Sequence, residues 1–216
     1  MLYLANPCGS DAVATAMQDR SIGFIDTPRQ RNRRPAGVVW CADNGAYSDK
    51  FVEAEWWRFL VKHAGDAATC LFAVAPDVVG DAQATIERST PWMPKIRALG
   101  YPVAFVAQDG QEDLPVPWDA FDVLFIGGST EWKLGHHARR LAAQAKRRGK
   151  RVHMGRVNSA KRYRDAAAIG CDSVDGTYLA FAPDANLQNV LSWSQGSDQI
   201  GLFGWDHLTP DERDHK

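Results

Sequence analysis

The sequence predicts a compact, single-domain (β/α)8 barrel of the α/β class. Eight short apolar runs alternate with segments that have the apolar spacing of helices, and several of those segments end in glycine, as helices often do. Most of the runs are continuously apolar rather than alternating, which indicates strands buried on both faces of a parallel sheet. An open, doubly wound sheet is the competing architecture.

The expected elements follow one another along the chain with two interruptions. The strands are expected at residues 2–6, 22–25, 37–42, 69–75, 102–107, 122–127, 151–155 and 172–176. Helices are expected at 11–19, 51–65, 81–100, 131–149 and 159–170. The polar stretch "DTPRQRNRRP" replaces the helix after strand two, and the segment after strand five is short. We expect the barrel to occupy residues 1–191 and a polar tail to occupy 192–216.

The amino-acid composition favours a soluble protein over a membrane protein or a protein with a cysteine metal site. The 45% hydrophobic and 24% charged content is typical of a soluble globular protein. No apolar run reaches the roughly 18 residues that span a bilayer, so we expect a cytoplasmic protein without membrane contact. The four cysteines are scattered and form no C-x-x-C pair, which favours reduced, buried thiols over a metal site.

Basic residues are concentrated in one part of the chain. Residues 132–164 hold twelve lysines and arginines and no acid, which leaves thirteen bases against 26 acids elsewhere. Such an asymmetry is compatible with a surface for a polyanion, including nucleic acid. Solvated helices with cations near their C-termini explain the same block equally well.

Polar residues follow six of the expected strands. The strand ends read "WCADNGAY", "FAVAPDVVGD", "VAFVAQDG", "LFIGGST", "VHMGRVNS" and "CDSVDGTY". In a parallel barrel the carboxyl ends of the strands meet at one mouth, where active sites of this architecture lie. The sequence therefore predicts a polar site at that mouth.

These strand ends, taken in order, resemble the tRNA-guanine transglycosylase family, whose members exchange guanine for a 7-deazaguanine by breaking and remaking an N-glycosidic bond. The resemblance spans residues 37–183. It implies that Asp175, the second aspartate of "GCDSVDGTY", is the nucleophile, and that Asp43 of "ADNGAY" is the priming, base-contacting aspartate. It further implies that the base is bound by Asp77, Gln108, Gly127, Gly128 and Met154, with Met154 stacking under it.

Four departures refine the resemblance. The zinc subdomain of the tRNA-modifying members has no counterpart here, and the chain is much shorter than theirs. "PDVVGD" replaces the family's base-recognition stretch, and Arg156 stands where a small residue is usual. The short, zinc-free members that place 7-deazaguanines in phage or bacterial DNA are the closer comparison. This favours DNA over tRNA as the partner, with a free 7-deazaguanine as co-substrate and no metal or cofactor.

The residues are suited to this chemistry. A carboxylate such as Asp175 captures or stabilises an oxocarbenium-like C1′, and a second carboxylic acid with a raised pKa, Asp43, protonates the departing base. Asp172, by contrast, is expected at the start of the last strand, facing a neighbouring loop.

Other residues are candidates for holding the nucleic acid itself. Phosphate contacts are expected from residues that open segments at the mouth: Arg29, Arg31, Arg33, Arg34, Lys133, Arg156, Lys161 and Arg162. Trp132 is the tryptophan placed to stack on a base or ribose, whereas Trp56, Trp57 and Trp92 are expected in the core or an interface.

Three other functions stay open at this point. A DNA glycosylase would use the same carboxylates and let water resolve the intermediate. A nucleic-acid-binding barrel without turnover is an alternative of another class, and a phosphosugar barrel enzyme is a fourth. The sequence also leaves open whether the protein works alone or as a homodimer.

Overall fold

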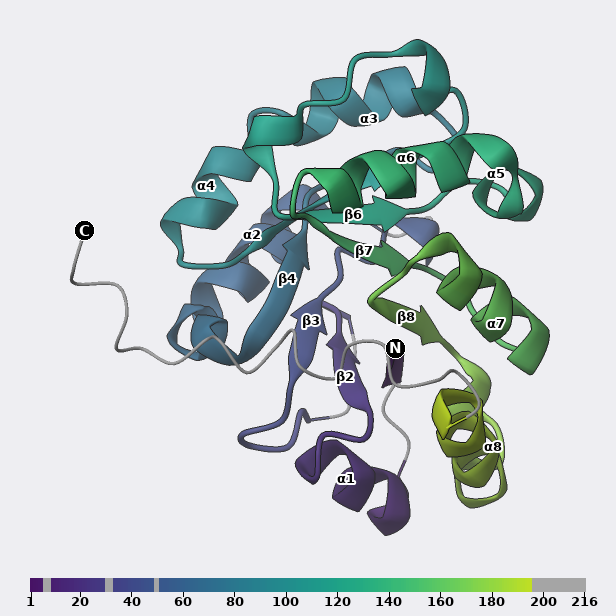
Figure 1. Cartoon of the computed structure of the whole chain (residues 1–216). Coiled ribbons are helices and arrows are strands. Elements are labelled where there is room, and N and C mark those ends of the chain that lie inside the picture. Colours follow the sequence, from purple (N-terminus) through teal and green to yellow (C-terminus); the bar gives the residue numbers. More distant parts are fainter. Residues whose placement is uncertain (6–8, 30–32, 49–50, 196–216) are drawn as a thin grey trace, which may run out of the picture.

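The computed structural model describes residues 1–5, 9–29, 33–48 and 51–195. Eight parallel strands, paired in chain order, close into a barrel with helices around it, which confirms the predicted fold (Figure 1). The strands are β1 (Leu2–Ala5), β2 (Gly23–Asp26), β3 (Trp40–Ala42), β4 (Cys70–Val74), β5 (Val103–Ala107), β6 (Val123–Ile126), β7 (Arg151–Met154) and β8 (Ser173–Gly176).

The helices differ from expectation in three places. They are α1 (Asp11–Gln18), α2 (Glu53–Lys62), α3 (Ala82–Ser89), α4 (Met93–Ala98), α5 (Thr130–Leu134), α6 (His136–Arg147), α7 (Ala160–Ile169) and α8 (Pro183–Gln195). The helix expected over 81–100 is divided near Pro91, which lacks an amide hydrogen. The helix expected over 131–149 is divided at Gly135, whose ψ of 179° is extended. Helix α8 runs across the boundary expected at 191/192.

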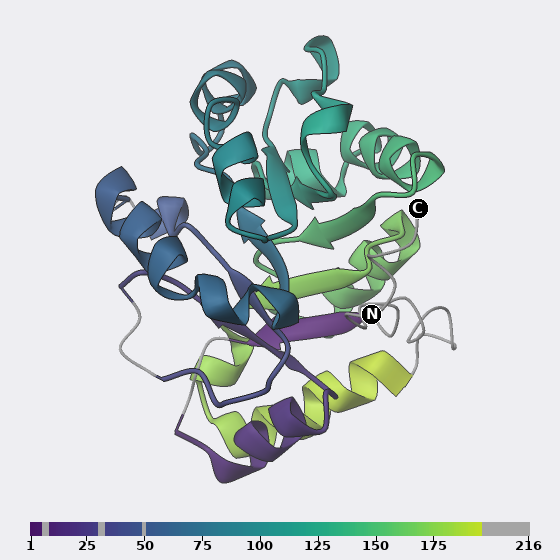
Figure 2. The same cartoon turned by 90° about the vertical axis from the view of Figure 1, so that its left-hand side faces the viewer.

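The barrel closes where its first strand pairs with its last strand. Strand β1 pairs with β8 in parallel, with Leu4 opposite Asp175. Helices α1 and α8 lie side by side next to this seam in both views, purple beside yellow-green (Figures 1 and 2). Within the part of the chain that the structure describes, no helix is both long and apolar enough to cross a membrane.

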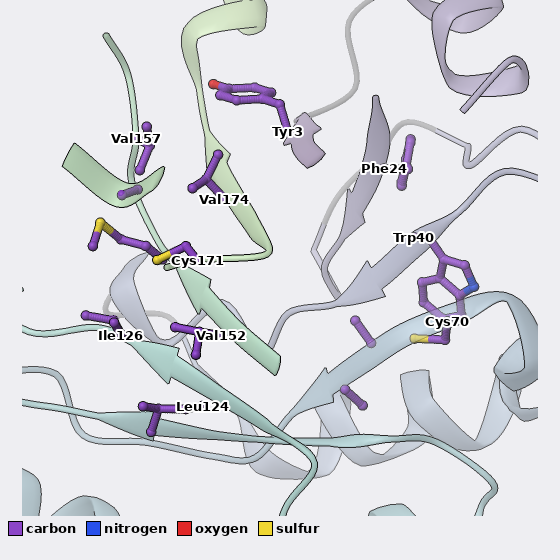
Figure 3. Close-up of a cluster of buried hydrophobic side chains, with 14 of the residues drawn as sticks. Tyr3, Phe24, Trp40, Cys70, Leu124, Ile126, Val152, Val157, Cys171 and Val174 are labelled. Carbon is purple, nitrogen blue, oxygen red and sulfur yellow. The ribbon is translucent and has the colours of Figure 1, made fainter. Parts of the chain in front are cut away.

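Alternate residues of the strands face two separate hydrophobic layers. The larger layer lies between strands and helices and includes Leu124, Ile126, Val152 and Val174 (Figure 3). The smaller one is built from strand residues and therefore fills the barrel interior. Its buried members are Leu4, Ile25, Cys41, Leu71, Phe72, Val74, Ala104, Val106 and Val123.

In the segment between β2 and β3, the described residues form no helix, as expected. One of them, Arg34, packs against the outer side of β3. Arg34 lies with its guanidinium carbon 3.9 Å from the ring centre of Trp40, Nη2 2.6 Å from Asp66, and Nε 3.6 Å from Asp26. Its side chain is only 9% exposed. The predicted phosphate contact of Arg34 is therefore wrong, because this arginine is buried in the outer layer of the barrel.

At the opposite end of the barrel, an ion pair joins Asp172 to Lys146 of α6. Asp172 accepts hydrogen bonds from Lys146 Nζ at 2.6 Å and from the Val152 amide at 2.7 Å. Asp172 thus lies directly before the last strand, one residue earlier than that strand begins, and faces a neighbouring segment as expected. The ion pair also places Lys146, at the end of α6, on the face away from the mouth.

Candidate active site

A pocket opens at the carboxyl ends of the strands and brings together most of the residues singled out from the sequence. Its cavity volume is about 70 Å³, well below the roughly 300–1,000 Å³ typical of small-molecule sites. Seven predicted residues line it: Asp43, Asp77, Gln108, Gly127, Gly128, Arg156 and Asp175. Asn44, Tyr47, Val74, Val79, Val106, Phe125 and Gly155 complete the lining.

Asp43 is placed by the tight turn that follows β3. Its Oδ1 accepts the amide hydrogen of Gly45 at 3.0 Å, and Gly45 has a φ of +73°, which glycine adopts without steric cost. Burial, followed by the negative charge of Asp175, raises the pKa of Asp43 to about 7. Near neutral pH this carboxyl group can therefore hold and release a proton.

Asp77 and Gln108 form a buried hydrogen-bond network with Asn44. The two oxygens of Asp77 accept from Asn44 Nδ2 at 2.8 Å and from Gln108 Nε2 at 2.7 Å. Burial raises the pKa of Asp77, and these two hydrogen bonds oppose the shift. Asn44 also donates to the carbonyl of Ala75 at 2.9 Å, so its orientation is fixed. The sequence placed Asn44 within "ADNGAY" but did not indicate a role for it.

The two glycines after β6 approach their neighbours too closely for a side chain. A Cβ on Gly127 would lie 2.7 Å from Val106 Cγ1, and one on Gly128, whose φ is +71°, would lie 2.6 Å from Asp109 Oδ2. The amide of Gly127 donates to the Ala107 carbonyl, and that of Gly128 donates to Gln108 Oε1 at 2.8 Å. Each amide therefore already has an acceptor in this structure, and the contact of Gly127 and Gly128 with a base stays a prediction.

Asp175 is held at both carboxylate oxygens. Oδ2 lies 2.9 Å from Nε2 of His153, and Oδ1 accepts the amide hydrogen of Arg156 at 3.2 Å. The side chain keeps 14% of its surface exposed, toward the pocket. His153 was missed from the sequence, although strand alternation in "RVHM" and "SVDG" places His153 and Asp175 on the same, inward face.

Arg156 spans the edge of the pocket. Its φ of +61° is unusual for a residue with a side chain. Its guanidinium donates to the Gly128 carbonyl and lies 4.4 Å from the ring centre of Tyr47, which is 64% exposed. Arg156 is thus in the pocket, as predicted, but its side chain already bonds a pocket carbonyl.

Three predicted contacts are corrected because the side chains point elsewhere. Met154 follows His153 on β7, so it faces the helices, is fully buried and does not line the pocket. Trp132 is 9% exposed and donates from Nε1 to Glu112 at 2.7 Å, outside the pocket lining. Lys133 is 1% exposed and donates from Nζ to the Gly155 carbonyl at 2.7 Å, so it is not free for a phosphate.

The remaining basic candidates differ in accessibility. Arg33 is exposed, and Arg29 is exposed and paired with Glu55 at 3.1 Å. Lys161 is 78% exposed and pairs with Asp165 at 2.9 Å, while Arg162 reaches the Arg156 carbonyl at 3.5 Å. Arg31 lies outside the described residues.

The cysteines and the tryptophans expected in the core behave largely as predicted. Cys41, Cys70 and Cys171 are buried free thiols, while Cys8 lies outside the described residues. Trp56 is fully buried, with Trp92 at 5.4 Å between ring centres. In the described ranges, no cluster of three or more histidine, cysteine or acidic side chains could hold a metal ion.

Comparisons with known proteins support the architecture alone. The sequence matches no protein-family profile and no curated protein. The structure is similar to phosphoribosyl anthranilate isomerase from Thermus thermophilus, with a TM-score of 0.51 and 13% identity over 91% of this chain and 99% of that one. For 3-hexulose-6-phosphate synthase from Salmonella typhimurium the TM-score is 0.49 and the identity 14%, over 91% and 100% of the chains. At this identity, the match to the isomerase shows that the chain has the fold of a TIM barrel.

Proposed function

We propose that the protein is a nucleic-acid base-exchange enzyme that replaces guanine in DNA with a 7-deazaguanine. The observation that carries the proposal is the pairing of two carboxyl groups in one pocket. Asp175 is oriented by hydrogen bonds to both of its oxygens, and Asp43 has a pKa of about 7. One group is thus arranged as a nucleophile and the other as a proton donor, which displacement at an anomeric carbon requires.

The reaction balances with these two groups. An oxygen of Asp175 bonds to C1′ as the N-glycosidic bond breaks, and the departing guanine takes the proton of Asp43. The incoming 7-deazaguanine then returns its ring N–H proton to Asp43 and bonds to C1′. The ester bond to Asp175 breaks, which restores both carboxyl groups to their starting states.

Recognition of the base is assigned to the network beside these carboxyl groups. Asp77, Gln108 and Asn44 present buried carboxylate and amide groups to the pocket. In the structure, Gln108 bonds Asp77 and the Gly80 and Gly128 amides, so binding exchanges these hydrogen bonds for bonds to the base edge. A base inside a duplex cannot reach such a pocket, so the target nucleotide must be single-stranded or flipped.

The test is incubation of the protein with single- or double-stranded DNA and labelled 7-deazaguanine. We expect label in DNA with the wild-type protein and none with Asp175→Asn. Asp119→Asn, an exposed carboxylate outside the pocket lining, is the matched control and should retain activity. A parallel reaction with tRNA tests the choice of nucleic acid, and label in tRNA alone would overturn the assignment to DNA.

Two other outcomes would contradict the proposal, and each would indicate a different function. Abasic sites without incorporated label would identify a hydrolytic glycosylase. DNA binding that is equal in the wild type and Asp175→Asn, with neither incorporation nor abasic sites, would indicate a binding barrel without turnover.

A further inference from the structure

A polar chain of three residues lies inside the barrel beneath the pocket. Nδ1 of His153 is 2.8 Å from the hydroxyl oxygen of Ser173, and Nε2 is 2.9 Å from Oδ2 of Asp175. The His153 side chain is fully buried and Ser173 is 2% exposed. Of these three residues, Asp175 alone lines the pocket.

Aromatic rings enclose the imidazole. The ring centres of Phe72 and Phe125 lie 4.9 Å and 4.5 Å from that of His153. The rest of the interior is formed by apolar side chains such as Leu4 and Val106. Burying an imidazole and a hydroxyl in such surroundings is unfavourable unless both are hydrogen-bonded, and an apolar side chain would fill the space without that cost. His153 and Ser173 therefore do more than fill space in the barrel interior.

The hydrogen-bond roles follow from Asp175. An ionised carboxylate only accepts hydrogen bonds, so Nε2 of His153 must carry the hydrogen. In the neutral ring Nδ1 is then an acceptor, and the hydroxyl of Ser173 donates to it. Asp175 thus selects the tautomer of His153 that directs an N–H group at it, and the hydroxyl of Ser173 supports this tautomer by donating to Nδ1.

We propose that His153 and Ser173 are positioning residues for Asp175. The inference rests on the proposed function, in which Asp175 is the nucleophile. The Nε2–H group fixes the rotation of the carboxylate, leaving Oδ1 directed by the Arg156 amide. When the ester bond to C1′ breaks, the same N–H group stabilises the charge that returns to Asp175. His153 does not line the pocket, so its contribution is to turnover rather than to base binding.

Kinetics of three variants test this assignment. His153→Leu, which keeps the volume and removes both ring nitrogens, should lower kcat for base exchange about 10–100-fold, with KM for the base changed less than about twofold. His153→Gln can place an amide N–H near the position of Nε2 and should recover most of that loss. Ser173→Ala should cost about 3–10-fold by releasing the tautomer. An unchanged kcat in folded His153→Leu would overturn the proposal.

Nitrogen NMR of histidine-labelled protein gives a readout that needs no activity. We expect the wild type to show Nε2 protonated and Nδ1 unprotonated, with the Nε2 hydrogen exchanging slowly because the ring is enclosed. Ser173→Ala should weaken this preference. A His153 ring without a hydrogen on Nε2 would overturn the inference. Slow-exchanging Nε2–H in a wild-type protein that exchanges no base would instead overturn the proposed function and support the arrangement around Asp175.

Discussion

Asp43 and Asp175 face the same pocket from opposite halves of the chain, and the charge of Asp175 adds to burial in raising the pKa of Asp43 to about 7. Asp175 itself accepts hydrogen bonds from His153 and from the Arg156 amide. The surroundings of the two carboxyl groups therefore differ in kind. Asp43 is thus suited to donate a proton, and Asp175 is suited to act as the charged nucleophile.

The rate of base exchange should fall with pH above neutrality. Asp43 must be protonated to assist the departing base, and its pKa is about 7. We expect kcat for the wild type to fall by about tenfold for each pH unit above roughly 7.5, measured as label incorporated into DNA. A rate that rises between pH 7 and pH 9 would contradict the assignment of Asp43 as the acid.

Asp43→Asn should stabilise the protein at alkaline pH while abolishing exchange. The pKa of Asp43 in the folded state lies above its value in the unfolded state, so its contribution to stability is present at low pH and is lost as pH rises toward 7. The neutral amide avoids that loss. In urea unfolding at pH 8 we expect a gain of about 1–3 kcal/mol, and at pH 4 a gain near zero.

The control for this stability change is Asp172→Asn. Asp172 bonds Lys146 and the Val152 amide at the other end of the barrel, so the loss of its charge should destabilise the protein at pH 8. Equal shifts in the two variants would show that the charge of Asp43 has no special environment.

Substitution of Arg33 should affect DNA binding, whereas substitution of its neighbour Arg34 should affect stability. Arg33 is exposed and is one of the predicted phosphate contacts, so Arg33→Ala should weaken DNA binding and reduce the magnitude of the salt-dependence slope by about one. Arg34 is buried between Trp40, Asp66 and Asp26. Arg34→Ala should leave DNA affinity unchanged and lower the free energy of unfolding by about 2–3 kcal/mol. The reverse pattern in titrations at several salt concentrations would contradict this division.

Gly128→Ala should be destabilising, whereas Gly65→Ala should be nearly neutral. A Cβ at Gly128 meets Asp109 and lies 2.8 Å from Trp132 Cε3, and the backbone there has a φ of +71°. We expect a loss of about 1–3 kcal/mol on thermal or urea unfolding, with weaker base binding because the Gly128–Gln108 hydrogen bond is disturbed. A methyl group added at Gly65 would have no atom within 4 Å, so this glycine is the matched control.

The sequence predicted the barrel and most of the pocket for a simple geometric reason. Parallel strands bring their carboxyl ends to one place, so residues directly after strands, such as Asp43 and Gln108, had to converge. The errors arose where the direction of a side chain matters. Met154 and His153 are adjacent on β7, and only the inward one, His153, can touch Asp175.

Other errors depended on partners distant in the sequence. Nothing near Arg34 in the chain indicates that Asp66, 32 residues further on, pairs with it. Lys133 was predicted to contact a phosphate because it opens a segment at the mouth, yet its Nζ bonds the carbonyl of Gly155, 22 residues further along the chain. Such long-range contacts exist only in the assembled barrel.

The seam between β1 and β8 affects when the protein can act. Asp175 pairs with Leu4, so the proposed nucleophile lies on the last barrel strand to leave the ribosome and next to the first. A nascent chain that has reached only β7 contains Asp43, Asp77 and Gln108 but no group to attack C1′. Under the proposed function, the emerging protein is therefore inert toward DNA until its eighth strand is in place, and the same holds for any fragment that ends before it.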